Sequence, residues 1–140
     1  MSYTRIVPIE FNHCDPAGIV FYPRYFEMIN SVVENFFEDH VGWSFARMHT
    51  GGKHNGVPTV SISCNFMAPS RLGDKVPFTL EVLSVGRSSV KVRITAAVGG
   101  EVRLITENTL VWIDDGKAAP WPEEIRMKLQ DMLQTGGQDG

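Results

Sequence analysis

The sequence predicts an α+β fold in which one long helix covers an antiparallel sheet of about five strands. Only one segment, which begins at Pro23, repeats apolar side chains at the helical period over several turns. Residues 3–11 and most of residues 59–113 instead alternate apolar and polar side chains, as half-buried strands do. A sheet with one face to bury and one long helix to cover it forms two layers. No repeat or linker divides the 140 residues, so we expect a single domain over residues 1–134 and a disordered tail over residues 135–140.

The first strand is predicted at residues 3–11, and the long helix is predicted between Pro23 and Gly42. Proline suits the first turn of a helix, because its missing N–H would be unpaired there in any case, and glycine readily ends a helix. The apolar face of this helix carries Phe26, Ile29, Val33, Phe36, Phe37 and His40. We therefore expect His40 to be a satisfied packing residue rather than a catalytic base.

The remainder of the chain is mostly β-like. A short helix is possible at residues 44–48, and the glycine-rich loop 49–56 follows it. Half-buried strands are then predicted at residues 59–66, 78–82, 90–98 and 102–113. Gly99-Gly100 is a hairpin signal, because glycine reaches the positive φ angles that two-residue hairpin turns demand. A closing helix is expected around residues 125–133.

The composition argues against several classes of function. A net charge of -3 at pH 7 with no run of basic residues disfavours a nucleic-acid partner. Cys14 and Cys64 lie far apart without CxxC spacing, which disfavours a zinc site and a disulfide framework. The N-terminus lacks a basic segment followed by an apolar core, and no window approaches about 18 consecutive apolar residues. We therefore expect a cytoplasmic protein with no membrane partner.

The stretch HCDPAGIVFYPRYF, residues 13–26, has two interpretations. Asp-Pro-Ala-Gly at residues 15–18 is a type I turn signal, with Asp accepting backbone N–H bonds and Pro at the second position. The segment also leads straight into a helix N-terminus at Pro23, where unpaired N–H groups and a partial positive charge would stabilise an oxyanion close to the Asp15 carboxylate. The residues alone leave both a simple turn and a catalytic site open.

Rival chemistries are weaker. His13, Cys14 and Asp15 are adjacent, and neighbours on a strand point to opposite faces, so they cannot ligate one metal without a bend in the chain. A nucleophilic Cys-His pair would need Cys14 or Cys64 to meet a distant histidine, which the sequence does not establish. Cys64 falls in the apolar phase of its strand and is expected in the core. No phosphate-binding loop or GxSxG pattern occurs.

The stretch FNHCDPAGIVFYPRYFEMIN, residues 11–30, resembles the signature of the hotdog-fold acyl-CoA thioesterases. Within them it is similar to the 4-hydroxybenzoyl-CoA thioesterase branch, in which a D-P-A-G-I-V-aromatic-Y-P run is characteristic. Related bacterial acyl-CoA thioesterases usually carry histidine where this chain has Pro23, which favours the aromatic branch. The resemblance continues through residues 56–74 and 85–92, and so covers most of the chain up to about Trp112.

The resemblance implies a long helix wrapped by a curved antiparallel sheet, and an edge-to-edge homodimer that commonly forms a homotetramer. The active site then lies between subunits and needs neither a metal nor another cofactor. By position, Asp15 matches the catalytic carboxylate, acting as nucleophile or as base for water, and the Tyr22 backbone N–H matches the group that polarises the thioester carbonyl. Gly18 would let the backbone pass close to the acyl group. The residues that match the segment in contact with CoA are Arg87, Ser88 and Ser89.

His13 stands where relatives often carry an acidic residue two positions before the catalytic aspartate. Residues two apart on a strand share a face, so we expect His13 to contact the same cleft as Asp15 and the substrate.

The leading hypothesis is hydrolysis of an acyl-CoA, of the 4-hydroxybenzoyl-CoA kind, to a free acid and CoA. A short- or medium-chain aliphatic acyl-CoA is an alternative substrate. A non-catalytic acyl-CoA or acyl-carrier binding module is the alternative outside enzymes. A hotdog-type dehydratase is disfavoured, because Glu27 and Glu34 fall on the outer face of the helix. The aromatic residues that would line an acyl pocket, or else belong to the core, are Phe21, Tyr25, Trp43 and Phe45.

Overall fold

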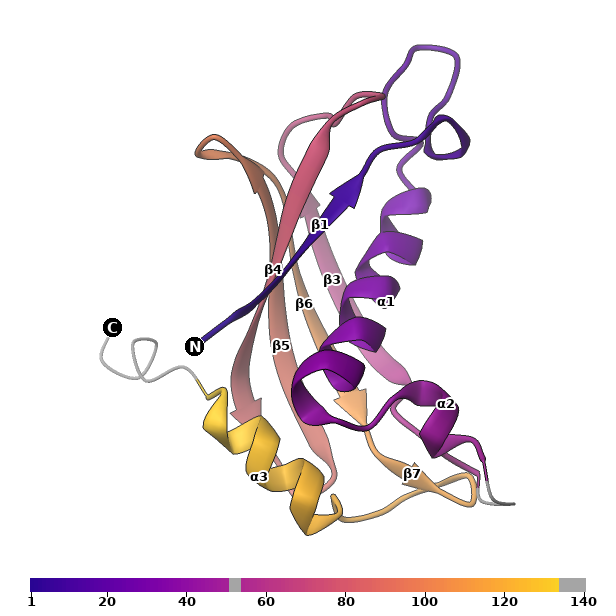
Figure 1. The fold of residues 1–140 in the computed structure, drawn as a ribbon, viewed down its shortest axis with the longest axis vertical. Helices are drawn as coiled ribbons and strands as arrows, with labels where there is room; N and C mark the ends of the chain where they lie inside the picture. Colours follow the sequence, from indigo (N-terminus) through magenta and orange to yellow (C-terminus); the bar gives the residue numbers. More distant parts are fainter. Residues whose placement is uncertain (51–53, 134–140) are drawn as a thin grey trace.

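The molecule is built from two layers, a five-stranded antiparallel sheet and the helix α1 that lies across it (Figure 1). This computed structural model describes residues 1–50 and 54–133. The strands follow the order β1-β4-β5-β6-β3. Their bounds are β1 Tyr3–Pro8, β3 Thr59–Phe66, β4 Lys75–Val85, β5 Ser89–Val98 and β6 Glu101–Val111. The predicted α+β class, with one long helix and a five-stranded sheet, is confirmed.

The long helix consists of α1, Arg24–Phe36, and a π-helical turn η2, Phe37–Val41. Its buried face is apolar and comprises Tyr25, Met28, Ile29, Val32, Val33 and Phe36 in α1. Pro23 caps the start, and Gly42 ends η2 in the left-handed conformation at φ 82°, as the sequence predicts. His40 stacks on Phe36 at 5.8 Å, which confirms its packing role. Its Nε2 is nevertheless buried without a partner among the described residues, so the expectation that it is satisfied is wrong.

The first strand is shorter than predicted. β1 ends at Pro8 rather than at residue 11, because the backbone of Ile9 bonds to the loop at Gly73 and Asp74 instead of continuing the ladder with β4. Phe11–His13 then form a 3₁₀ helix, η1. Phe11 is 84% exposed, and so does not occupy the buried strand position that the alternation suggested.

The strands β4, β5 and β6 alternate buried and more exposed residues, as predicted. β3 departs from this pattern, because it is the edge strand beside β6 and nothing among the described residues pairs with its other side. Seven of its eight residues are exposed, including Val60 at 60% and Ile62 at 41%. Cys64 is half-buried against the core, and burial raises the pKa of its thiol.

The connections follow local turn chemistry. Gly99 and Gly100 both have positive φ angles and join β5 to β6, which confirms the predicted hairpin. The strand predicted at residues 102–113 ends at Val111. A small second sheet, which the sequence did not predict, follows from β2 Asn55–Gly56, β7 Ile113–Asp114 and β8 Lys117–Ala118.

Two short helices complete the domain. α2, Phe45–Met48, is capped by Ser44, whose Oγ accepts from the Arg47 amide at 3.0 Å. α3, Glu123–Asp131, buries Ile125 and Leu129 and covers one end of the sheet (Figure 1). Both were predicted within a few residues. The tail predicted to be disordered lies outside the described residues, and so do residues 51–53 of the glycine-rich loop.

Tyr3 ties β1 to the end of the long helix. Its hydroxyl donates to the Asp39 carboxylate at 2.6 Å. Desolvation, together with this hydrogen bond, raises the pKa of Tyr3 to about 12. In the described ranges, no helix combines the length and the apolar character that crossing a membrane requires.

Candidate active site

The tetrapeptide Asp15-Pro16-Ala17-Gly18 forms the turn that the sequence predicts. The Gly18 amide donates to the Asp15 carbonyl at 2.9 Å, which closes the turn. The Ala17 amide donates to Asp15 Oδ1, also at 2.9 Å, so the side chain is held by its own turn. Gly18 has a φ of 79°, a conformation that glycine adopts without strain.

The turn doubles the chain back on itself. Cys14 and Val20 form an antiparallel bridge, and the Asp15 amide donates to the Ile19 carbonyl at 3.0 Å. The Phe21 amide donates to the His13 carbonyl at 2.9 Å. These hydrogen bonds hold residues 19–21 alongside residues 13–15, and Tyr22 follows directly, at the start of the helix. Asp15 and Tyr22 therefore belong to one hydrogen-bonded loop, residues 13–22, which we call the site loop.

The site loop rests on a second loop, residues 69–74, which we call the ledge. The Val20 amide donates to the Ser70 carbonyl at 2.9 Å, and the Leu72 amide donates to the Gly18 carbonyl at 3.0 Å. Ser70 is fully buried, and its amide donates to the Tyr25 hydroxyl at 3.2 Å. The ledge thus holds the site loop and the first turn of α1 in one arrangement.

An arginine fixes the ledge from β6. Arg103 Nη1 donates to the Ser70 hydroxyl at 3.1 Å, to the Pro69 carbonyl at 3.2 Å and to Asp74 Oδ2 at 3.0 Å. The Arg71 amide also donates to Asp74 Oδ2, at 2.9 Å. The Arg71 amide, followed by the Arg103 guanidinium, lowers the pKa of the Asp74 carboxyl below its usual value. The ledge is therefore cross-linked by charge-assisted hydrogen bonds.

The helix start leaves one backbone donor for a ligand. The amides of Arg24, Tyr25 and Phe26 donate to the carbonyls three residues before them, at 2.9 to 3.2 Å. Pro23 has no N–H. The Tyr22 amide donates no hydrogen bond to any described residue. The sequence predicted several unpaired N–H groups at this helix start, and among residues 22–26 only the Tyr22 N–H is unpaired. The helix dipole favours negative charge at this position.

The Asp15 carboxylate is likewise half engaged. Oδ1 accepts from the Ala17 amide, whereas Oδ2 has no hydrogen-bond partner within residues 1–50 and 54–133. The side chain is half-buried rather than fully exposed. One oxygen therefore orients the group, and the other remains available for a reacting atom.

Aromatic side chains gather beside this site. The Phe66 ring, at the end of β3, lies 5.9 Å from Tyr22, 5.8 Å from Tyr25 and 6.3 Å from Phe26. Phe21 lies 5.9 Å from Tyr22. Phe21, Tyr22 and Phe66 are exposed by about half, although aromatic rings normally bury more of their surface. Sequence reasoning did not assign Phe66 to the site, because its spacing marks only a strand position.

A cavity of about 290 Å³ runs between α1 and β3, and we call it the α1–β3 cavity. It is lined by Phe26, Ile29, Asn30, Val33, Thr59, Ile62 and Asn108. Phe26 is shared with the aromatic group around Phe66, so the cavity and the site loop are neighbours. Among the other aromatic candidates, Tyr25 is buried, and Trp43 and Phe45 lie by α2 at the far end of the helix.

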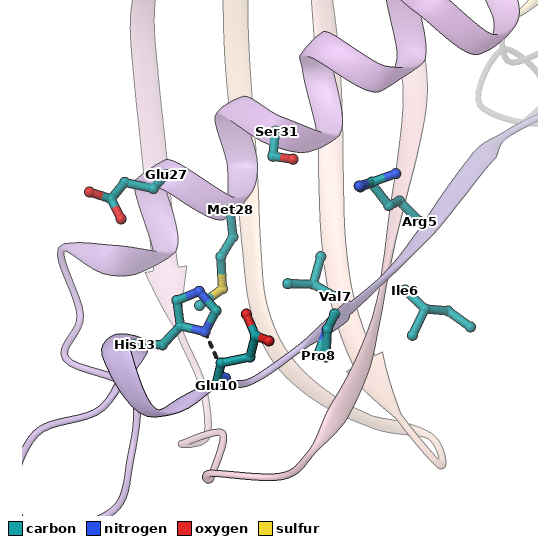
Figure 2. A pocket seen from close by; sticks show the side chains of 9 residues that line it. All are labelled: Arg5, Ile6, Val7, Pro8, Glu10, His13, Glu27, Met28 and Ser31. Atoms are coloured by element: carbon teal, nitrogen blue, oxygen red, sulfur yellow. Dashed lines mark hydrogen bonds between the residues drawn. The ribbon is translucent and has the colours of Figure 1, made fainter.

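His13 does not occupy the position expected of it. It lies in η1, so the argument that it shares a strand face with Asp15 is wrong. Its Nδ1 accepts from the Glu10 amide at 2.8 Å. Figure 2 shows its ring beside Glu10 and Met28, in a pocket of about 310 Å³ between β1 and α1. Asp15 and Tyr22 do not line that pocket.

Arg87, Ser88 and Ser89 lie at the opposite end of the sheet. Arg87 and Ser88 lie in the turn between β4 and β5, and Ser89 begins β5, beside α3, whereas the site loop lies where α1 begins (Figure 1). Their carbonyls accept from the Trp121 amide, the Trp112 amide and Trp121 Nε1, at 2.8 to 3.0 Å. Within one chain, the structure does not bring these residues to Asp15. The described residues also contain no group of three or more side chains placed to hold a metal ion.

One long helix packed against a five-stranded antiparallel sheet is the architecture of the hotdog fold. Comparison with known families makes the assignment specific. The chain belongs to the thioesterase-like superfamily, whose family model matches residues 9–129. The fold and the enzyme class predicted from the sequence are thereby confirmed.

Individual relatives agree with this placement. A Haemophilus influenzae protein described as an uncharacterized acyl-CoA thioester hydrolase is 29% identical over 110 residues, which span 66% of this chain and 71% of that protein. A gentisyl-coenzyme A thioesterase shares the fold with a TM-score of 0.81 at 23% identity, covering 91% of this chain and 99% of its own. A 1,4-dihydroxy-2-naphthoyl-CoA thioesterase from Synechocystis does so with a TM-score of 0.84 at 18% identity, covering 94% and 98%.

Proposed function

We propose that this protein hydrolyses an acyl-CoA with an aromatic acyl group, of the 4-hydroxybenzoyl-CoA kind, to a free acid and CoA. The observation that carries the proposal is the pairing of two unused groups in one loop. Asp15 Oδ2 and the Tyr22 N–H have no partner among the described residues, and a single hydrogen-bonded ladder fixes the backbone of both.

The Tyr22 amide polarises the thioester carbonyl. A carbonyl oxygen that accepts from this N–H becomes an oxyanion as the carbon is attacked, and the start of α1 stabilises the negative charge. Gly18 has no side chain, and its Cα presents little bulk to an acyl group passing the turn.

Asp15 acts by one of two routes. As a nucleophile, its carboxylate forms a bond to the thioester carbon, the C–S bond breaks, and the CoA thiolate takes a proton from water. Water then hydrolyses the mixed anhydride and restores the carboxylate. As a base, Asp15 takes a proton from a water molecule that attacks the same carbon, and the proton passes to the leaving thiolate.

An aromatic acyl group is supported by the rings around the site. Phe21, Tyr22 and Phe66 offer exposed aromatic surface next to the free amide. The solved structures with the same fold include proteins named for gentisyl-CoA and dihydroxynaphthoyl-CoA, whose acyl groups are aromatic.

The protein is proposed to act as a homodimer that pairs β3 with β3 of a second copy. An open edge strand with apolar side chains is a template for pairing, and a two-fold axis brings the same edge of both copies together.

Antiparallel pairing would set the α3 end of one copy beside the site loop of the other. Arg87, Ser88 and Ser89 of the second copy would then reach the CoA moiety, and the guanidinium suits its phosphates. A homotetramer built from two such dimers, located in the cytoplasm, completes the proposal.

The decisive variant is Asp15→Asn, which keeps the size of the side chain and its acceptor oxygen for the Ala17 amide. We expect kcat for 4-hydroxybenzoyl-CoA to fall by about a thousandfold or more, because neither a nucleophile nor a base remains. Turnover is measured as free thiol released from the CoA ester. Asp131→Asn, on the exposed face of α3, is the matched control and should keep native turnover.

Near-native turnover in Asp15→Asn would refute the assignment of this residue. Binding of benzoyl-CoA or a medium-chain acyl-CoA by the native protein without any thiol release would instead indicate a binding module. The two routes are separated by the acyl-enzyme itself. Rapid quench of a single turnover, followed by mass spectrometry of the protein, finds Asp15 acylated in the nucleophilic route and unmodified in the base route. Label incorporated into Asp15 in heavy-oxygen water would also establish the nucleophilic route, with water attacking the Asp15 carbon of the anhydride.

A further inference from the structure

Two polar side chains are buried on the helix-facing side of β6. Thr106 is fully buried and Asn108 is 2% exposed, in a row that continues with the apolar Leu104 and Leu110. The Thr106 hydroxyl donates to Asn108 Oδ1 at 2.9 Å, which fixes the orientation of the amide. Across the ladder, Asn108 faces Val92 on β5 and Ile62 on β3.

The side-chain amide nitrogen of Asn108, Nδ2, has no hydrogen-bond partner among the described residues, although Oδ1 is engaged. Asn108 lines the α1–β3 cavity, where Ile29, Val33 and Ile62 supply apolar walls. Nδ2 is not among the enclosed side-chain atoms of the described residues that lack a partner, so it opens onto this cavity, where a ligand oxygen can accept from it.

The cavity extends away from the thioester position. It begins at Phe26, one helical turn after Tyr22, and ends at Val33. The seven helical rises from Phe26 to Val33, at about 1.5 Å each, give it a length of about 10 Å. An acyl group whose carbonyl accepts from the Tyr22 amide would pass the Phe66 ring, enter at Phe26 and extend toward Asn108.

We infer that Asn108 is a specificity-determining residue, which donates a hydrogen bond from Nδ2 to an oxygen at the far end of the acyl group. This inference rests on the proposed function. The favoured substrate carries a terminal hydroxyl on an aromatic acyl group longer than benzoyl, such as hydroxycinnamoyl, and ω-hydroxyoctanoyl is the corresponding group for the alternative of an aliphatic substrate. The apolar walls would pack against the ring or chain, and the Asn108 amide would bond to the hydroxyl at its end.

The experiment compares esters that differ by one hydroxyl. The pairs are cinnamoyl-CoA with 4-hydroxycinnamoyl-CoA, and octanoyl-CoA with 8-hydroxyoctanoyl-CoA. In the native protein we expect kcat/KM for the hydroxylated member of at least one pair to exceed that of its partner by about tenfold or more, because a site built to bond a hydroxyl rejects the analogue that lacks it.

Asn108→Leu, of similar size, should reduce that ratio to about one. Its melting temperature should fall, because the buried Thr106 hydroxyl loses the Oδ1 to which it donates. Asn35→Leu is the control, since the Asn35 amide already donates to the Ser31 carbonyl at 2.8 Å, and it should leave the ratio at its native value. Asn108→Thr, whose hydroxyl is too short to reach the same point, replaces Asn108→Leu if the latter does not fold.

A ratio near one for both pairs in the native protein overturns the inference, and so does a ratio that survives in Asn108→Leu or Asn108→Thr. A lower melting temperature with an unchanged ratio would assign Asn108 to the fold alone. In each of these cases the protein still hydrolyses acyl-CoA, so the proposed function stands. Absence of thiol release from all four esters and from 4-hydroxybenzoyl-CoA would refute the proposed function, and the inference with it.

Discussion

At the scale of single residues, Asp15 has two tasks that its side chain divides between its oxygens. Oδ1 caps the turn through the Ala17 amide, and Oδ2 is left for chemistry. Because the turn itself holds the carboxylate, no neighbouring acid or histidine is required to position it. The Tyr22 N–H is also available, because it lies at the helix start and has no acceptor among the described residues.

Gly18 allows a prediction with an internal control. Gly18→Ala places a side chain at φ 79°, and Gly42→Ala does the same at φ 82°, with no atom within 4 Å of the added Cβ in either case. Each should lose about 1 kcal/mol of stability, because L-residues are strained in this region. Only Gly18→Ala should lower kcat as well, since only that strain falls on the site loop.

Thermal unfolding and thiol release from the same two preparations test this prediction. An equal loss of activity in Gly42→Ala would show that the effect on kcat reflects general stability rather than the site loop.

The residues of the site differ in how well sequence predicts them. The Asp-Pro-Ala-Gly turn is local, and its geometry follows from four residue types. The neighbourhoods of Phe66 and Asn108 depend on which strand ends beside which helix turn, and no spacing in the sequence encodes that contact. The position predicted for His13 was wrong for a similar reason. β1 ends at Pro8, so His13 lies in η1 rather than in a strand, and its Nδ1 accepts from the Glu10 amide.

At the scale of elements, the site loop depends on the ledge as much as on its own turn. Residues 69–74 have no regular structure, yet Arg103 on β6 bonds to three acceptors in them. Of these three acceptors, only the Asp74 carboxylate is charged. Its lowered pKa means that the folded state prefers the ionised form more strongly than the unfolded state does.

This linkage predicts an acid-dependent difference between the native protein and Asp74→Asn. At neutral pH the native protein should be the more stable. As pH falls from about 4 through the lowered pKa of Asp74, that advantage should disappear, because the folded carboxylate must then take up a proton. Melting temperatures recorded from about pH 7 to about pH 3 measure the difference.

A double-mutant cycle supplies the control for Asp74. In an Arg103→Met background, part of the effect of Asp74→Asn should vanish, because the guanidinium is one of its two donors. A difference between Asp74→Asn and the native protein that is the same at every pH would contradict the charge-assisted account.

The elements also show where periodicity is a sufficient guide. α1, β4, β5 and β6 lie inside the two layers, and their hydrophobic periods match their burial. β3 has the same alternation but is exposed, because it is an edge strand and no described residue pairs with its outer side. Alternation alone therefore predicts a strand, and it does not predict whether the chain itself buries that strand.

At the scale of the whole molecule, the two edges of the sheet make opposite predictions. β1 is one edge strand and β3 is the other. Val60→Lys on β3 should convert the proposed homodimer to a monomer and abolish turnover, because an edge lysine blocks strand pairing. Ile6→Lys on β1 is matched to it, since both side chains are 60% exposed, and it should leave the dimer intact.

The mass of each variant in solution, measured by light scattering, decides this prediction. A Val60→Lys protein of unchanged mass would remove β3 as the pairing edge. A native protein that is monomeric at all concentrations would remove the proposed dimer.

The open edge of β3 also has a consequence for how the amount of this protein matters in a cell. The proposed pairing would be bimolecular, so the fraction of chains with a completed site would rise with their concentration. Dilution would then lower the activity of each molecule as well as the number of molecules. Under the proposed pairing, the rate of synthesis of this protein would set both the number of enzyme molecules and the activity of each one.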